Sequence, residues 1–150
     1  MSVYLLDTNI VLTYLRKAQE SIQLEQKLLL LRPENTLIVS VVSVGEMRSI
    51  AMQNAWGEQR LTRLEDFFLR LMIAEINVDS VIKRYAEIDA YSQGWHPAIK
   101  GAFSPRNMGK NDLWIAATAS ILGVELITMD RDFDHLDTIF IQLKKVKLKD

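Results

Sequence analysis

The chain begins with a short apolar run that ends abruptly in the acid Asp7, followed by the polar residues Thr8 and Asn9. Over residues 10–15, apolar side chains recur at helical spacing. This order predicts a buried strand over residues 3–7 that delivers Asp7 to the edge of a sheet. Ligands of open α/β sheets bind beyond the carboxyl ends of the strands. Asp7 is therefore a candidate functional residue.

The rest of the chain alternates between strand-like and helix-like patterns. Further strands are predicted over residues 37–42, 74–78, 125–128 and 139–143. Helices are predicted over residues 8–17, 22–31, 43–57, 57–72, 79–88 and 111–122. Such alternation favours a parallel sheet with helices on both faces. We predict an α/β three-layer sandwich with a central, mostly parallel sheet of four or five strands, in one domain over residues 1–150.

Composition excludes several kinds of site. The formal net charge is −1, so a polyanion would have to be held by local basic patches or bound cations. The chain has no cysteine, which excludes disulfides, thiolate metal sites and cysteine nucleophiles. It lacks the pattern of a signal peptide and the apolar run of about eighteen residues that a membrane helix needs. We expect a cytoplasmic protein with no membrane association.

Each acid near a predicted strand end has a purely structural explanation when taken alone. Asp7 precedes a helix, where acids are favoured as caps. Ser43 and Glu46 have the spacing of a capping box. Asp112 stands at a helix start, where a negative charge complements the helix dipole. The acids of the 130–132 segment lie in a turn, and turns favour aspartate.

Together the acids suggest more than caps. Asp7, Glu46 and Asp130 all follow predicted strands, so in a parallel sheet they project from one edge. Asp112 opens the helix that leads into the strand over residues 125–128, and the sequence leaves open whether that helix start reaches the same edge. Crowded carboxylates cannot all ionise without a cation, because like charges raise one another's pKa. Oxygen ligands of this kind suit Mg²⁺, with Mn²⁺ as a substitute.

Four parts of the chain, taken in order, form a recognisable set: Leu-Leu-Asp-Thr-Asn over 5–9, Glu46, Asn-Asp-Leu-Trp-Ile-Ala-Ala-Thr-Ala over 111–119, and Leu-Ile-Thr-Met-Asp-Arg-Asp-Phe over 126–133. This set resembles the PIN-domain ribonucleases and is most similar to the VapC-like toxins of bacterial toxin–antitoxin pairs. No single segment is specific, but the ordered set is, and it covers essentially the whole chain.

The resemblance implies that four acids gather around one or two Mg²⁺ ions and that a metal-activated water hydrolyses RNA phosphodiester bonds. The acidic positions are Asp7, Glu46, Asp112 and Asp130. The supporting positions are Thr8, Asn111 and Asp132. Asp7 and Asp112 are the expected direct ligands, which brings Asp112 to the common edge. The resemblance also implies a homodimer and a small cognate antitoxin that blocks the site.

An RNA substrate needs positive charge around an acidic pocket. The segment over residues 94–110 is rich in glycine and proline and is predicted to be a long loop, and long ordered loops are often functional. Three of its cations can contact phosphate groups: Lys100, Arg106 and Lys110. Trp95 and Phe103 can stack on unpaired bases, although anchoring the loop to the core is the simpler explanation for both. The lysine-rich tail is expected to be solvated.

The helix over residues 57–72 carries more apolar side chains than one buried stripe requires. Phe67 lies beside the stripe formed by Leu64 and Phe68. We therefore consider Phe67 a candidate for a protein–protein interface.

Other functions fit the sequence less well. A dehalogenase-type phosphatase would need a second aspartate at position 9, which is Asn9, and a receiver domain would need paired acids in the first strand–helix loop. A non-catalytic PIN-like binding module is disfavoured because all four acidic positions are filled. A housekeeping RNA-processing nuclease remains the alternative to a toxin, and a small upstream gene encoding a DNA-binding N-terminus would favour the toxin.

Overall fold

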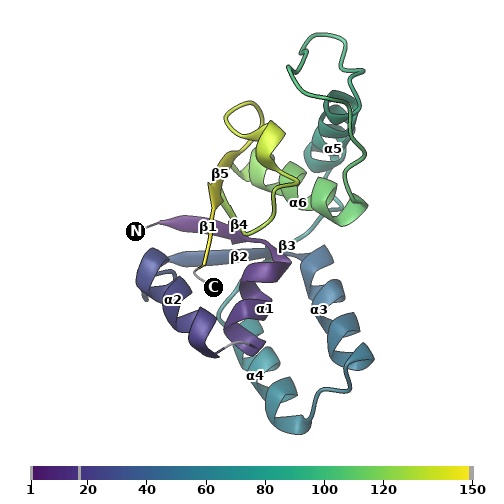
Figure 1. Ribbon diagram of the computed structural model, residues 1–150. Helices are drawn as coiled ribbons and strands as arrows, with labels where there is room; N and C mark the ends of the chain where they lie inside the picture. The colour runs from purple at the N-terminus through teal and green to yellow at the C-terminus, as the bar shows by residue number, and fades with distance from the viewer. Residues whose placement is uncertain (1, 17, 149–150) are drawn as a thin grey trace.

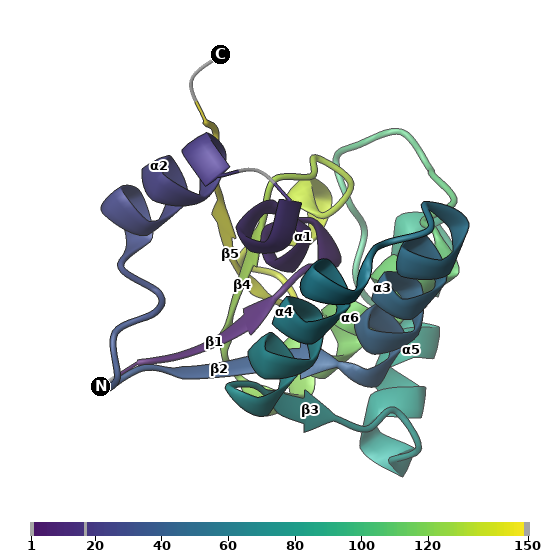
Figure 2. The same cartoon turned by 90° about the horizontal axis from the view of Figure 1, so that it is seen from below.

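A five-stranded sheet forms the centre of the computed structural model, which describes residues 2–16 and 18–148. The strands are β1 Val3–Leu6, β2 Thr36–Ser40, β3 Met72–Ala74, β4 Glu125–Thr128 and β5 Gln142–Lys145. Their order is β3-β2-β1-β4-β5, and every neighbouring pair is parallel (Figure 2). The carboxyl ends of all five strands therefore meet at one edge.

Helices cover both faces of the sheet (Figure 1). They are α1 Thr8–Arg16, α2 Ala18–Leu28, α3 Val41–Gln53, α4 Glu58–Leu69, α5 Asp79–Ser92 and α6 Lys110–Leu122, with a short 3₁₀ helix, η1, at Asp134–Leu136. In Figure 1, α1 to α4 lie below the sheet, and α5 and α6 lie above it. The predicted α/β sandwich around a parallel sheet is confirmed. None of the described helices is long and apolar enough to cross a membrane.

The two faces of the sheet have separate cores, and β1 contributes to both. Successive side chains of a strand point to opposite faces. Leu6 packs with Ile10 and other residues of α1 to α4, whereas Leu5 packs with Ile115 and Phe133 on the α5–α6 side. All five side chains are fully buried. The apolar run before Asp7 therefore fixes the end of β1 between two cores, which leaves little freedom for the acid that follows.

The end of β2 differs from the prediction, and the difference changes the role of Glu46. The strand stops at Ser40, whose hydroxyl accepts the backbone N–H of Val42 at 3.2 Å and caps α3. The β-branched pair at 41–42 therefore begins the helix, because the cap outweighs strand propensity here. Ser43 lies inside α3, so the capping-box interpretation of Glu46 is wrong.

The two outer strands were misplaced by the sequence analysis. β3 comes earlier than the predicted 74–78, and β5 comes later than the predicted 139–143. The turn after η1 continues through Ile139, whose backbone N–H donates to the carbonyl of Leu136 at 3.1 Å. The apolar side chains at the start of the predicted 139–143 strand therefore belong to a turn.

Helix ends match the prediction unevenly. The expected end of the first helix at Lys17 lies outside the described residues. The second helix stops at Leu28, before the expected 31, because Leu29 adopts a positive φ of 54°. The predicted C-terminal cap of α6 is confirmed, since Gly123 has a φ of 66°.

Phe68 belongs to the core rather than to a surface. It is 7% exposed and packs with the α1–α4 side of the sheet, while Phe67 is half-buried against the ring of Tyr14, with centroids 5.7 Å apart. Leu69, the next residue, is 85% exposed. Phe68 is therefore a core residue, and the interface role of Phe67 stays a prediction.

Replacement of Phe68 by alanine should lower the free energy of unfolding by about 3 kcal/mol, because it removes a buried ring and leaves a cavity. Urea unfolding followed by circular dichroism measures the change. Leu69→Ala is the matched control and should change stability by less than about 0.5 kcal/mol. Equal effects of the two substitutions would contradict the assignment of Phe68 to the core.

Candidate functional site

Asp7 is buried at the carboxyl edge of the sheet and is held by hydrogen bonds to its backbone and to its carboxylate. Its backbone N–H donates to the carbonyl of Ile127 at 2.9 Å, which extends the pairing of β1 with β4. One carboxylate oxygen accepts the N–H of Thr8 at 2.8 Å, and the other accepts the hydroxyl of Thr128 at 2.7 Å. Asp7 is 4% exposed. The carboxylate is therefore fixed in position by groups from β4 and from the start of α1.

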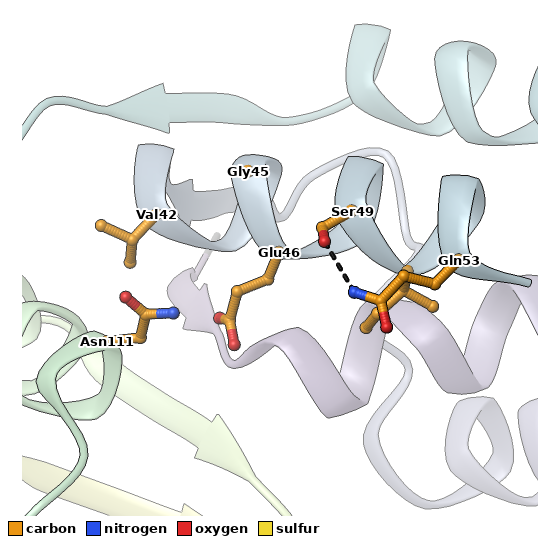
Figure 3. A pocket seen from close by; sticks show the side chains of 7 residues that line it. Val42, Gly45, Glu46, Ser49, Gln53 and Asn111 are labelled. Atoms are coloured by element: carbon orange, nitrogen blue, oxygen red, sulfur yellow. Dashed lines mark hydrogen bonds between the residues drawn. The ribbon is translucent and has the colours of Figure 1, made fainter.

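Glu46 is positioned from a different direction. The hydroxyl of Thr8 lies 2.8 Å from a carboxylate oxygen of Glu46 and 2.8 Å from the hydroxyl of Ser43. This contact joins the start of α1 to α3. Figure 3 shows the side chains of Glu46 and Asn111 pointing into one pocket, of about 510 Å³, between α3 and α6.

Asp130 and Asp132 lie in the segment that follows β4. The N–H of Asp130 donates to the hydroxyl of Thr128 at 3.0 Å, and the N–H of Asp132 donates to the carboxylate of Asp130 at 3.0 Å. Thr128 therefore links the carboxylate of Asp7 to the backbone of Asp130. The turn aims both acids toward the start of α6.

Asp112 reaches the same place because of how α6 enters the sheet. Only residues 123–124 separate the end of α6 from the start of β4. The helix must therefore run against the strand direction, and its first turn lies at the carboxyl edge. Carboxylate oxygens of Asp112, Asp130 and Asp132 all lie within 4.8 Å of one another. The structure thus answers the question of position that the sequence left open.

Burial and mutual repulsion disfavour the ionised form of two of these acids. Burial raises the pKa of Asp7 to about 6, against the opposing effect of its hydrogen bonds from Thr128 and Thr8. Burial, and then the negative charge of Asp7 and of the neighbouring acids, raises the pKa of Asp112 to about 7. A bound cation would relieve both effects. The donor atoms are carboxylate oxygens, which fits a hard divalent ion such as Mg²⁺ or Mn²⁺.

Comparison with known proteins identifies the family. A model of the PIN domain matches residues 4–139. The chain belongs to the PIN-domain family. It is 32% identical over 126 residues to Ribonuclease VapC1 of Haemophilus influenzae strain R2866, covering 84% of this chain and 85% of the relative. It is 29% identical over 96 residues to Ribonuclease VapC4 of Mycobacterium tuberculosis, covering 63% of this chain and 67% of the relative.

Solved structures share this PIN-domain fold. VapBC2 from Rickettsia felis, bound to a promoter DNA fragment, superposes with a TM-score of 0.72 at 22% identity and covers 95% of this chain and 98% of that one. DNA-bound VapBC from Salmonella typhimurium gives a TM-score of 0.71 at 21% identity, covering 97% and 98%. These structures share the fold, and the similarity to Ribonuclease VapC1 confirms the resemblance to VapC-like proteins that the sequence suggested.

The residues singled out in the loop over 94–110 differ in how exposed they are. Phe103 is half-buried and packs against the rings of Tyr91 and His135, with centroids 5.2 Å and 4.9 Å away. Anchoring is therefore the correct explanation for Phe103. It is wrong for Trp95, which is 80% exposed. The three predicted RNA-binding cations, Lys100, Arg106 and Lys110, are all exposed.

Three residues that hold this PIN-domain site together were not predicted from the sequence. Thr128 joins Asp7 to Asp130, and Ser43 contacts the hydroxyl of Thr8. The side-chain oxygen of Asn9 accepts the N–H of Met129 at 3.3 Å, which ties the start of α1 to the segment after β4. Thr128 was the one with a signal in the sequence, because a hydroxyl that ends an otherwise apolar strand needs a partner.

In EDTA, the protein should lose stability as pH rises from about 4 to about 7, because the folded state binds the proton of Asp7 more tightly than the unfolded chain does. The raised pKa stabilises the fold fully below the ordinary aspartate pKa, and this contribution disappears above the raised one. Between pH 4 and pH 7, this effect of Asp7 should lower the free energy of unfolding by an amount on the order of 2 kcal/mol, as measured by urea unfolding. In the Asp7→Asn variant this decrease should be absent.

Asp66→Asn, at an exposed residue of α4, is the matched control and should leave the pH-dependent loss in place. A stability difference between Asp7→Asn and the unsubstituted protein that stays constant from pH 4 to pH 7 would show that Asp7 is not perturbed in the fold.

Proposed function

We propose that this PIN domain is a Mg²⁺-dependent endoribonuclease that hydrolyses RNA phosphodiester bonds, with Mn²⁺ as a possible substitute, and that it acts in the cytoplasm. The observation that carries the proposal is the convergence of carboxylates from four separate segments at one edge of the sheet. The convergence is clearest at Asp112, because the negative charges of the surrounding acids help to raise its pKa. Such an arrangement costs stability unless a cation offsets the repulsion.

Each acid has a distinct role in this proposal. We assign Asp7 and Asp112 as direct metal ligands. Asp7 is buried, Asp112 is half-buried, and the pKa of each is raised in the absence of a cation. Glu46 and Asp130 complete the site as ligands or orient ligating waters, and Asp132 supplements them. When bound, the divalent ion lowers the pKa of a coordinated water and neutralises charge on the phosphoryl group.

Hydroxyl groups position these carboxylates rather than react. The hydroxyl of Thr8 orients Glu46, and the hydroxyl of Thr128 orients Asp7. Groups of this kind fix the direction of ligand lone pairs, and their loss typically lowers metal affinity or activity by about 10- to 100-fold. Asn111 lines the same pocket as Glu46, and we assign it a supporting contact with the substrate or with an ordered water (Figure 3).

The substrate must cross acidic surface, so cations outside the acid cluster have to attract it. Lys110 precedes Asp112 in the first turn of α6, and Lys100 and Arg106 lie in the exposed loop before it. We assign phosphate contacts to these three residues. Trp95, with its ring largely exposed, can stack on an unpaired base of the same strand.

The similarity to ribonucleases named VapC, and to chains solved within VapBC complexes, supports a toxin of a toxin–antitoxin pair. On this proposal the protein forms a homodimer, and a cognate antitoxin binds it and restrains its activity. A housekeeping RNA-processing nuclease would share the chemistry. A small antitoxin gene next to the one for this chain separates the two.

The purified protein, free of any inhibitor, should cleave members of a panel of structured and unstructured RNAs in Mg²⁺ and none of them in EDTA. Asp7→Asn and Asp112→Asn should each lower the cleavage rate at least about 100-fold, because each removes a metal ligand. Gel analysis of end-labelled RNA measures the rates. Asp66→Asn should retain activity. Cleavage that persists in EDTA, or in both site variants, would contradict the proposed function.

A further inference from the structure

The topology of the sheet carries lysines to the acidic edge. β5 runs parallel to β4, and its register pairs Lys145 with Thr128. The next residue, Val146, donates its N–H to the carbonyl of Thr128 at 2.8 Å, which holds the chain at this edge as far as Lys147. Thr128 is also the residue whose hydroxyl binds Asp7. Lys145 and Lys147, although exposed, therefore lie near the acid cluster.

These lysines line a pocket of about 490 Å³, which we call the β5 cation pocket. Its lining residues are Met129, Arg131, Asp134, Lys145, Val146 and Lys147. Three of them are cations, and one acid, Asp134, stands among the described lining residues. Arg131 lies in the chain between Asp130 and Asp132, so the pocket adjoins the acid cluster directly.

The wall of the pocket is held in place from several sides. Lys145 forms an ion pair with Asp134, with nitrogen and oxygen 2.7 Å apart. The side chain of Lys27, on α2, donates to the backbone carbonyl of Lys147. Figure 2 shows the end of β5 beside α2. Buried Val146 packs into the core on the α1–α4 side, so Lys145 and Lys147 are fixed by their neighbour.

We propose that the β5 cation pocket binds phosphate groups of the RNA strand on one side of the cleaved bond. This inference rests on the proposed function. A chain with a net charge of −1 and a cluster of carboxylates must attract a polyanion locally. Lys110 supplies charge on the α6 side of the cluster, and the pocket supplies it on the β5 side. The strand then crosses the acids between two groups of cations.

The first test measures binding of a fluorescein-labelled single-stranded oligouridylate over a series of KCl concentrations, in the Asp112→Asn protein so that cleavage does not interfere. Adding Lys145→Gln and Lys147→Gln together should weaken binding about tenfold. It should also reduce the slope of log K against log salt by about 1.4, because each lost contact with single-stranded nucleic acid removes about 0.7.

Lys83→Gln is the matched control. Lys83 is paired with Asp79 at 3.0 Å, as Lys145 is with Asp134, but lies on α5, which follows the strand at the other edge of the sheet. The Lys83→Gln variant should leave the affinity for the oligouridylate and the salt dependence of binding unchanged. Thermal unfolding of each variant verifies that the fold is retained.

A second substitution tests the sign of the charge effect. Asp134→Asn removes the acid of the pocket and frees Lys145, so it should strengthen RNA binding about two- to threefold.

In protein with an intact acid cluster, the double lysine variant should raise KM for cleavage and leave kcat nearly unchanged, since the pocket contacts phosphates away from the reacting one.

Several results would overturn the inference. Equal losses in the lysine variants and in Lys83→Gln would show only a general charge effect. Cleavage of RNA with unchanged KM would leave the proposed function standing and remove the pocket from it. If these lysines bound RNA but the protein cleaved none, the proposed function would fail, and the inference would fail with it because it places the pocket beside the cleaved bond. Competition by micromolar inorganic phosphate would assign the pocket to a free anion, and loss of antitoxin affinity with unchanged RNA affinity would assign it to an acidic protein segment.

Discussion

Repulsion among carboxylates at the carboxyl edge of the sheet is the constraint on which the rest of the site depends. Asp7 is buried by two cores that meet at the end of β1, and it keeps its place because Thr8 and Thr128 donate hydrogen bonds to it. These bonds favour the carboxylate, but burial opposes it more strongly, so the pKa of Asp7 rises. A fold that retains this acid beside Asp112 stores unfavourable electrostatic energy that a divalent cation can release.

The sequence predicted the parts of the structure that depend on local pattern. The apolar run before Asp7 identified β1, and the position of Gly123 identified the end of α6. The sequence could not show the contact from Thr8 to Glu46, because Ser43 offered a capping box that matched the pattern. Ser40 was the true cap, and only tertiary packing distinguishes two serines three residues apart.

The wrong bounds predicted for the two edge strands of the sheet have a common cause. The outer strands β3 and β5 have few buried side chains, so neither shows the alternation that marks a half-buried strand. Met72 in β3 is 61% exposed. The position of Asp112 was open for a different reason, since it depends on the direction in which α6 enters the sheet. The consequence for function is largest at β5, where the true register brings Lys145 to the acidic edge.

The arrangement combines opposite charges in a small space. Acids occupy the centre of the carboxyl edge, and cations lie on both sides of them, at the start of α6 and at the end of β5. A metal ion at the centre would complete a positively charged path for a polyanion. The overall charge of the chain, close to zero, hides this local order, which is why composition alone gave no indication of a nucleic-acid substrate.

Calorimetric titration of the metal-free protein with Mg²⁺ tests the central claim most directly, when it is repeated in buffers of different ionisation enthalpy. Because the pKa values of Asp7 and Asp112 are about 6 and about 7 in the metal-free protein, Asp7 is about half protonated and Asp112 mostly protonated at pH 6, so binding of one ion should release about 1.4 protons there. The release should fall toward zero at about pH 8, and Asp112→Asn should abolish most of the binding. Absence of Mg²⁺ binding, or binding at pH 6 without proton release, would contradict the claim that these carboxylates form a metal centre.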